Sequence, residues 1–270
     1  MSLDLVIPAF NEAHRIDATL AAYRRQMPAD SRIIVALDRS PDGTAAIVER
    51  HASEDARVVL HDFPRLGKGG AIMESFRRCD ADLIAFVDAD GATPPQELLR
   101  LVDAARQSDG VIASRRHPAS VLPARRPFSR RISSIGFASA VRLLFGLPYL
   151  DTQCGAKVLR REVVQRSLPL LSARDFLFDV DLLLVARELG FDVREVPTVW
   201  IDRDGSRLDA GADAMRMGVA LLRLWLHHRS LPLHRTARVV QEDRERAREA
   251  TVSPPLVVVA DEEQSGHVAA

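Results

Sequence analysis

The amino-acid sequence predicts an α/β fold built on a mainly parallel, doubly wound sheet, and two observations lead to this prediction. Short apolar runs with strand character alternate with segments of helical periodicity through the first half of the chain. The links between them are short, as expected for repeated strand–helix units. With 270 residues, of which 47% are hydrophobic, the chain can bury a substantial core around such a sheet.

Strands are expected where short apolar runs end at polar, glycine-rich or proline-rich turns. Residues 83–87 are the clearest case, because a strand buried on both faces of a parallel sheet has a continuous apolar run. Residues 3–7 form a similar run that stops at Pro8. On these criteria the predicted strands are residues 3–7, 32–37, 57–60, 83–87, 111–114 and 193–200.

Helices are expected where apolar residues recur every three or four positions. Ile16, Leu20 and Tyr23 lie on one face of such a segment. The predicted helices are residues 12–26, 43–52, 69–78, 95–107, 132–145, 179–189 and 212–228.

The character of the chain changes after residue 115. Residues 115–131 are rich in arginine and proline, and we expect a mobile basic loop there. From about residue 236 the sequence is charged and then rich in small residues, so residues 236–270 are expected to be a poorly ordered appendage. We therefore predict one domain over residues 1–235.

Composition narrows the class of protein. Lys and Arg together equal Asp and Glu at 37 each, so no net charge favours a nucleic-acid partner. The two cysteines offer no disulfide framework, which fits a reduced, cytoplasmic setting. Asp4 interrupts the first apolar residues, so no signal peptide is expected. No stretch reaches the ~20 apolar residues of a membrane span, which leaves a soluble protein or one at the membrane's inner face.

The most informative motif is Asp88-Ala89-Asp90, at the carboxyl end of the predicted strand 83–87. Ligands of open α/β sheets bind at this edge. Alternate residues of an extended segment point the same way, so both carboxylates can face one cation. Hard oxygen ligands suit Mg²⁺ or Mn²⁺, which commonly bind substrate phosphates as well. The alternative is a pair of solvated loop acids.

The loop after the first predicted strand offers residues for a base and ribose pocket. Pro8 ends the strand, and Phe10 and Glu12 follow at the same edge as the Asp pair. The alternative is an ordinary turn in which Asn11 caps the next helix.

The loops after the second and third predicted strands add a carboxylate and a cation. Asp38 is a candidate acceptor for a nucleobase N–H, whereas Asp42 is better suited to a turn and helix start. Lys68 lies among Gly67, Gly69 and Gly70 at the start of a predicted helix. Glycines let backbone approach a ligand, and a helix N-terminus with an ammonium favours anions. The alternative is a flexible turn.

The second half contributes further polar candidates. Residues 151–157 include Gln153 and suit a wall that shapes a polar ligand such as a sugar. Asp179 and Asp181 begin a predicted helix: one is a candidate partner of the helix dipole, and the other a candidate base. Arg207 follows a turn and is placed to close over a diphosphate.

Taken together, these motifs resemble family 2 glycosyltransferases of the GT-A fold. The matching segments, in order and spacing, are residues 7–12, 38–44 and 88–90. Within that family, the chain resembles the dolichyl-phosphate β-glucosyltransferase branch at residues 67–71, 88–93 and 151–155. The resemblance extends from about residue 3 to residue 208.

The resemblance implies a metal-assisted, inverting enzyme that moves a hexose, with glucose favoured, from a UDP- or GDP-sugar to a polyprenyl phosphate. Residues 1–115 would form the nucleotide-binding half and residues 116–235 the acceptor half. The nucleoside would contact Pro8, Phe10, Glu12 and Asp38. The diphosphate and its Mg²⁺ or Mn²⁺ would contact Asp88, Asp90, Lys68 and Arg207.

Two other interpretations stay open. The same fold could serve a soluble or saccharide hydroxyl acceptor, in which case Asp179 or Asp181 would act as the base. A non-catalytic nucleotide-sugar-binding module would bind the donor without turnover.

Three segments have two possible interpretations: residues 115–131, 132–147 and 212–228. They could form a peripheral membrane contact. Alternatively, the two helices pack against the core and the basic loop is solvated.

Overall fold

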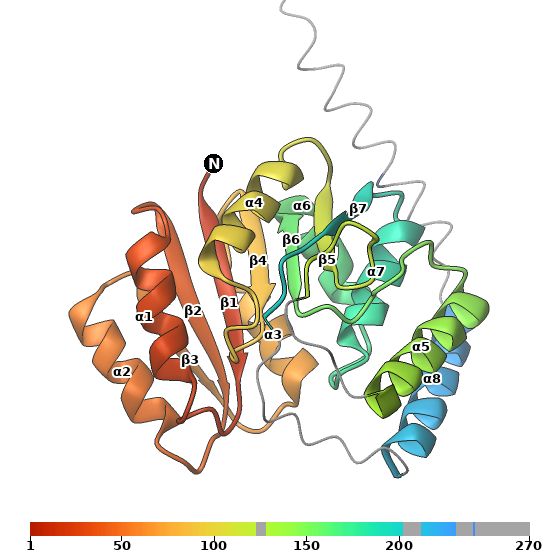
Figure 1. The fold of residues 1–270 in the computed structure, drawn as a ribbon, viewed down its shortest axis with the longest axis horizontal. Helices are drawn as coiled ribbons and strands as arrows, with labels where there is room; N and C mark the ends of the chain where they lie inside the picture. The colour runs from red at the N-terminus through yellow and green to blue at the C-terminus, as the bar shows by residue number, and fades with distance from the viewer. Residues whose placement is uncertain (123–127, 202–211, 231–239, 241–270) are drawn as a thin grey trace, which may run out of the picture.

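The computed structural model describes residues 1–122, 128–201, 212–230 and 240. Within these residues, seven strands form one sheet in the order β3-β2-β1-β4-β6-β5-β7 (Figure 1). All neighbouring strands are parallel except β6, which runs antiparallel to both β4 and β5. The strands are β1 (Leu3–Ala9), β2 (Ser31–Asp38), β3 (Val58–Phe63), β4 (Leu83–Val87), β5 (Gly110–Ser114), β6 (Ala156–Arg160) and β7 (Val193–Pro197).

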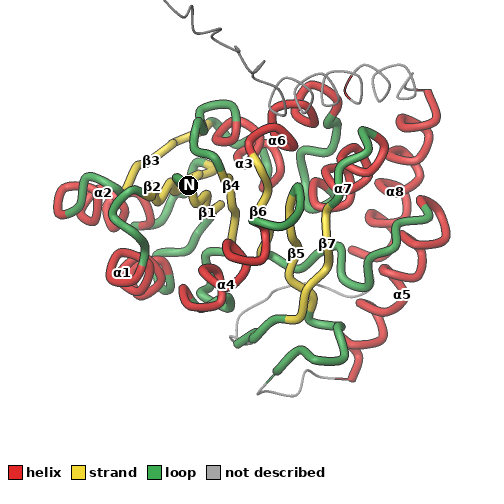
Figure 2. Tube along the Cα trace, turned by 90° about the horizontal axis from the view of Figure 1, so that it is seen from above, coloured by secondary structure: helices red, strands yellow, loops and turns green. Residues whose placement is uncertain are grey.

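Helices cover both faces of the sheet, as Figures 1 and 2 show together. The α-helices are α1 (Ile16–Gln26), α2 (Thr44–Glu54), α3 (Lys68–Phe76), α4 (Pro95–Ala105), α5 (Phe128–Phe145), α6 (Arg161–Ser167), α7 (Phe178–Glu188) and α8 (Ala212–Ser230). A short 3-10 helix, Leu168–Leu170, follows α6. The α/β architecture with a mainly parallel sheet is confirmed.

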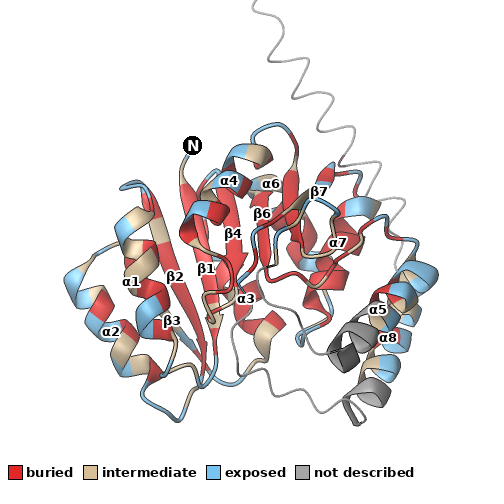
Figure 3. Ribbon diagram, viewed as in Figure 1, coloured by how far each residue is buried: buried red, intermediate tan, exposed pale blue. Residues whose placement is uncertain are grey.

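Two hydrophobic cores lie on opposite faces of the sheet. Leu5 and Ile7 of β1 face a core shared with α1, α2 and α4, whereas Val6 faces a core shared with α3, α6 and α7. Successive strand residues point to opposite faces, so both sets must be apolar when helices cover both sides. Figure 3 shows the resulting buried sheet. This double burial explains the continuous apolar runs in the sequence.

Strand β6 and helix α6 do not appear among the sequence-based predictions. β6 has only five residues, and Lys157 lies inside it, opposite Phe86 of β4 and Ile112 of β5. A short segment that contains a lysine lacks the apolar signal of a central strand. The polar wall expected over residues 151–157 is therefore divided, and its last residues are part of the sheet.

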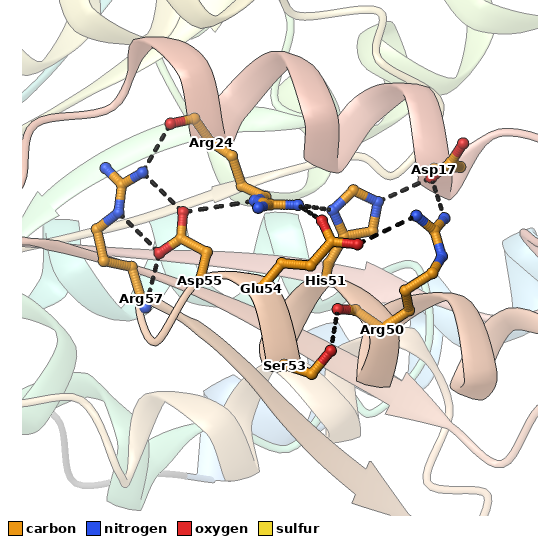
Figure 4. Close-up of polar contacts among 8 residues, drawn as sticks. All are labelled: Asp17, Arg24, Arg50, His51, Ser53, Glu54, Asp55 and Arg57. Atoms are coloured by element: carbon orange, nitrogen blue, oxygen red, sulfur yellow. Dashed lines mark hydrogen bonds and ion pairs between the residues drawn. The ribbon is translucent and has the colours of Figure 1, made fainter.

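Helix α1 is tied to α2 and to the turn between α2 and β3 by ion pairs and hydrogen bonds (Figure 4). Arg24 donates to Nδ1 of the buried His51 at 2.7 Å, and Nε2 of this histidine lies 2.8 Å from Asp17. Arg57 binds Asp55 at 2.8 Å and the backbone oxygen of Arg24 at 2.7 Å. Because Arg24 can only donate, His51 carries its proton on Nε2 and donates it to Asp17.

Several predictions fall on residues that the structure does not describe. Residues 123–127 of the predicted basic loop, Arg207 and, apart from residue 240, the predicted appendage 236–270 are among them. In the part of the chain that is described, no helix is both long and apolar enough to cross a bilayer.

Candidate active site

Asp88 and Asp90 follow β4 at the carboxyl edge of the sheet, as the sequence predicts. The Asp88 N–H donates to the Gly155 oxygen at 3.0 Å, which joins this turn to the residue before β6. Oδ1 of Asp90 accepts the N–H of Ala92 at 2.9 Å. Gly91, between Asp90 and Ala92, has φ +69°, a left-handed conformation that glycine adopts without steric cost.

Lys68, the first residue of α3, reaches the same carboxylates. Its Nζ lies 2.8 Å from Oδ1 of Asp88, and the two side chains are 36% and 29% exposed. Burial by itself would lower the pKa of Lys68, but the charges of Asp88, Asp179 and Asp90 outweigh it and raise that pKa. Lys68 is therefore a permanent cation at this edge.

The two carboxylates fit a divalent cation. Burial, and then the neighbouring charge of Asp88, raise the pKa of Asp90 above its usual value. A bound cation would relieve this repulsion, and carboxylate oxygens are ligands that Mg²⁺ and Mn²⁺ accept. Among the described residues no cluster of three acidic, His or Cys side chains could hold a metal.

Gly155 lies directly against the Asp88 carboxylate. A Cβ atom placed on Gly155 would come within 1.8 Å of Oδ2 and 2.2 Å of Cγ of Asp88, which no real pair of atoms tolerates. Glycine at this position is therefore required for the observed carboxylate conformation.

The loop before α3 is held from two sides. Both oxygens of Asp38 accept backbone N–H groups, from Leu66 and from Gly67, the latter at 3.0 Å. On the other side, Gly67 and Gly69 leave room for the backbone at residues 173–175: added Cβ atoms would lie 2.6 Å from the Arg174 oxygen and 2.7 Å from the Asp175 oxygen, respectively. These glycines allow close chain packing, in addition to any approach of a ligand. Asp38 positions the loop, and its nucleobase contact stays a prediction.

Pro8, Phe10 and Glu12 occupy the neighbouring edge, at the end of β1. Pro8 lies inside the strand, beyond the point where β1 stops pairing with β4. Phe10 is 39% exposed, and the Arg65 guanidinium lies 5.0 Å from the centroid of its ring. Glu12 forms two 2.7 Å hydrogen bonds with Arg15. Burial raises the pKa of Glu12 in spite of this arginine.

The alternative roles weighed for Asn11 and Asp42 have different outcomes. Helix α1 begins at Ile16 and has no side-chain hydrogen bond at its N-cap, so Asn11 does not cap it. Asn11 instead adopts φ +56°. Oδ1 of Asp42 accepts the Thr44 N–H at 3.1 Å, which confirms the structural role preferred for Asp42.

Asp179 and Asp181 are not free carboxylates. The fully buried Lys157 ammonium contacts Oδ1 of Asp179, donates to the Cys154 oxygen at 2.9 Å and lies over the Phe86 ring. Asp181 is fully buried and accepts hydrogen bonds through both of its oxygens. Its hydrogen-bond partners are the Ser172 and Ala173 backbone N–H groups, both at 2.7 Å, the Ser172 hydroxyl at 3.2 Å and His228 at 2.6 Å.

These contacts oppose the expectation that Asp179 or Asp181 serves as a base. A base needs a carboxylate that can reach the reacting hydroxyl. Asp179 is held by a buried ammonium and Asp181 by four donors, and the whole first turn of α7 is buried. The alternative role, a partner of the helix dipole, is also incomplete, because each of these carboxylates joins α7 to another segment of the chain.

Gln153 and Arg115 are each held in place by contacts with other residues. The Gln153 amide donates to the Phe176 oxygen at 2.9 Å, so this side chain is held in place. Arg115 forms a two-fold ion pair with Asp151, at 2.6 and 2.7 Å, and lies 5.1 Å from the Trp200 ring. Sequence reasoning missed Arg115, Gly155 and Lys157 as individual residues. Lys157 is one of only two lysines in the chain, and Gly155 lies in the segment 151–155 that resembles the family.

Comparisons with known proteins agree with this geometry. The model of the glycosyl transferase family 2 matches residues 4–168. The glycosyltransferase AglD of Haloferax volcanii is 33% identical over 83% of this chain, but the chain covers only 37% of that protein's length. The undecaprenyl-phosphate mannosyltransferase of Micrococcus luteus is 33% identical over 74% of this chain and 83% of its own. The dolichyl-phosphate beta-glucosyltransferase of Dictyostelium discoideum is 31% identical, with 82% and 73% covered.

A solved structure shares the fold. Glucosyl-3-phosphoglycerate synthase from Mycobacterium tuberculosis, crystallised with Mn²⁺, UDP and glucosyl-3-phosphoglycerate, superimposes with a TM-score of 0.61. The match covers 83% of this chain and 79% of that one, at 19% identity. The GT-A fold expected from the sequence resemblance is thereby confirmed. The family match over most of the chain and the relatives named above show that this protein is a glycosyltransferase that belongs to glycosyl transferase family 2.

Proposed function

We propose that the protein transfers a hexose, with glucose favoured, from a UDP- or GDP-sugar to a polyprenyl phosphate, with inversion at the anomeric carbon. The observation that supports this best is the grouping of Asp88, Asp90 and Lys68 at the carboxyl edge of the sheet. Two acids and a cation at this edge suit a metal–diphosphate group. The relatives from Micrococcus luteus and Dictyostelium discoideum are both named for a polyprenyl or dolichyl phosphate acceptor.

The donor half of the site assigns roles to individual residues. Asp88 and Asp90 would hold Mg²⁺ or Mn²⁺, which when bound neutralises the diphosphate that leaves as the anomeric C–O bond breaks. Lys68 would add a second positive charge on the diphosphate. Phe10, with its exposed ring beside Arg65, would contact the nucleoside. The structural neighbour crystallised with Mn²⁺ and UDP supports the use of a divalent cation with a nucleoside diphosphate.

The acceptor half favours a phosphate over a hydroxyl group. A phosphate is already anionic near neutral pH and needs to be positioned, whereas a hydroxyl group needs a base. The two carboxylates that could have supplied a base, Asp179 and Asp181, are both engaged in buried contacts. Gln153 belongs to this half and is fixed by a hydrogen bond, and Asp151 of the same half forms an ion pair with Arg115.

A lipid acceptor requires access to a membrane surface, and α5 with α8 offers one. The two helices lie side by side beyond β7 (Figure 2). Their exposed side chains include large apolar groups: Leu143, Leu144, Val219, Leu222 and Leu226. The exposed arginines Arg142, Arg223 and Arg229 accompany them. Apolar and basic side chains on one helix pair suit an anionic lipid surface, so we propose a peripheral position on the cytoplasmic face of the membrane.

The test is a transfer assay with a panel of UDP- and GDP-hexoses and a short polyprenyl phosphate, with Mg²⁺ or Mn²⁺ and with EDTA. We expect a lipid-phosphate sugar to form only with metal. Asp90→Ala should reduce turnover by roughly 100-fold or more, because the cation loses one of its two protein ligands. Full metal-dependent turnover by Asp90→Ala would rule out the metal assignment.

The same panel separates the competing functions. Transfer to glycerol or free sugars, with none to the lipid phosphate, would identify a hydroxyl acceptor. Donor binding by calorimetry without any product would identify a non-catalytic binding module.

A further inference from the structure

Asp88 is already engaged on both sides by groups of the protein itself. Oδ1 accepts a hydrogen bond from the Lys68 ammonium at 2.8 Å, and the Oδ2 side lies against Gly155. A metal ion that approaches Asp88 therefore meets a resident cation at Oδ1 and the Gly155 backbone close to Oδ2. Two cations in contact with one carboxylate repel each other, so the ion pair and a metal compete for Asp88.

Lys68 is held so that its ammonium stays at this place. It is the first residue of α3, and the preceding turn is fixed by the two hydrogen bonds that Asp38 accepts. The other carboxylates near Lys68 have partners of their own: Asp179 contacts Lys157, and Oδ1 of Asp90 accepts the Ala92 N–H. The Lys68 side chain is still 36% exposed, which leaves it room to swing away from Asp88.

We propose that Lys68 is an internal counter-ion that exchanges partners when the donor binds. Before binding, the ammonium neutralises Asp88 and weakens its attraction for a free divalent cation. The diphosphate then draws the ammonium from Asp88, and the carboxylate becomes available to the metal that arrives with the nucleotide. Metal and nucleoside diphosphate thus bind as one unit. This inference rests on the proposed metal site at Asp88 and Asp90.

The exchange predicts effects of opposite sign from one substitution. Lys68→Gln removes the competing cation, so the protein without nucleotide should bind Mn²⁺ about fivefold more tightly, the factor that corresponds to an exposed ion pair. The same variant should bind UDP or GDP, in the presence of Mn²⁺, about tenfold or more weakly, because a charged hydrogen bond to the diphosphate is lost. A residue that only stabilised the fold would weaken both.

The experiment consists of two titrations of the purified protein. In the first, Mn²⁺ is added without nucleotide and the free ion is followed by electron paramagnetic resonance. In the second, UDP or, in parallel, GDP is added at saturating Mn²⁺ and binding is followed by calorimetry. Lys68→Arg keeps the cation and should restore the wild-type pattern. Arg194→Gln makes the same change of net charge at an exposed pair on β7 and should leave both affinities unchanged. Circular dichroism checks that each variant is folded.

The outcomes separate this inference from the function on which it rests. Unchanged or weaker Mn²⁺ binding by Lys68→Gln without nucleotide overturns the exchange. Asp90→Ala serves as the second reference: if it leaves Mn²⁺ binding intact, the metal site itself is wrong. If Asp90→Ala abolishes binding while Lys68→Gln fails to strengthen it, the metal site stands and only the counter-ion role is lost.

Discussion

At the scale of single residues, the position of Asp88 depends on neighbours that contribute no ligand of their own. Gly155 gives the carboxylate its space, and the Gly155 oxygen accepts the Asp88 N–H. Lys68 then fixes the direction of Oδ1. The metal-binding geometry proposed for Asp88 and Asp90 therefore depends on Gly155, which has no side chain and lies in a different loop, directly before β6.

Gly155→Ala should impair catalysis more than stability. The added methyl group would force the Asp88 carboxylate out of its position, and a shift of ~1 Å at a reacting centre can cost roughly 100-fold in rate. We expect a comparable fall in kcat/KM for metal-dependent transfer, together with weaker Mn²⁺ binding. Gly136→Ala is the matched control, because a Cβ atom on this α5 residue meets nothing within 4 Å. Wild-type kcat/KM in Gly155→Ala would contradict the role given to this glycine.

At the scale of secondary-structure elements, polar and aromatic contacts hold the helices against the sheet and against one another. Lys157 of β6 contacts Asp179 of α7, and the rings of Phe76, Phe86 and Phe178 meet at centroid distances of 5.9–6.2 Å to join α3, β4 and α7. On the other face, the network around Arg24 and His51 holds α1 against α2.

The buried Lys157–Asp179 pair should show strong coupling. Lys157→Met leaves Asp179 as a buried charge without its partner and should lower the free energy of unfolding by about 3–5 kcal/mol. The double variant Lys157→Met with Asp179→Leu removes both charges and should recover most of that loss. Urea denaturation of the wild-type protein, Lys157→Met, Asp179→Leu and the double variant measures the coupling. Additive losses in the double variant would show that the pair does not act as a unit.

Asp55 should contribute to stability only above acidic pH. The hydrogen bond from Arg57 lowers the pKa of Asp55 to about 2, against the ordinary 3.8. Because the folded-state pKa is the lower one, the stabilisation is complete above about pH 4 and is lost as the pH falls towards 2. Asp55→Asn should lower the unfolding free energy at pH 7 by about 1–2 kcal/mol. Denaturant titrations at several pH values should show that this difference shrinks below pH 4 and disappears below about pH 2; a constant difference would exclude the ionic origin.

At the scale of the whole molecule, the chemistry and the proposed membrane contact lie in different parts of the fold. The carboxyl edge of β1, β2 and β4 carries the acids and Lys68, and the pair of α5 and α8 lies beyond β7 (Figure 1). Val141, Leu221 and Leu224 join the pair to the core. Other apolar residues of the two helices stay exposed, so the pair is both a structural layer and the proposed lipid-facing surface.

Leu222→Asp with Leu226→Asp should weaken lipid contact without unfolding the protein. The two leucines are 52% and 55% exposed, so their replacement changes the surface and leaves the core intact. We expect reduced sedimentation with anionic vesicles and a higher KM for polyprenyl phosphate, with little change in thermal stability. Ser53→Asp with Gln107→Asp adds the same charge at exposed positions on α2 and after α4 and controls for charge alone. Unchanged vesicle binding would remove α8 from the membrane proposal.

The sequence by itself determined the mainly parallel α/β fold, the edge where Asp88 and Asp90 lie, and the family. These features depend on local signals: apolar runs, their periodicity and the motif that follows a strand. The tertiary structure decided what each polar residue contacts. It buried Asp179 and Asp181, placed Lys157 inside a strand, and set Gly155 and Lys68 against Asp88. Such contacts join residues far apart in the chain, and no local pattern of residue types specifies them.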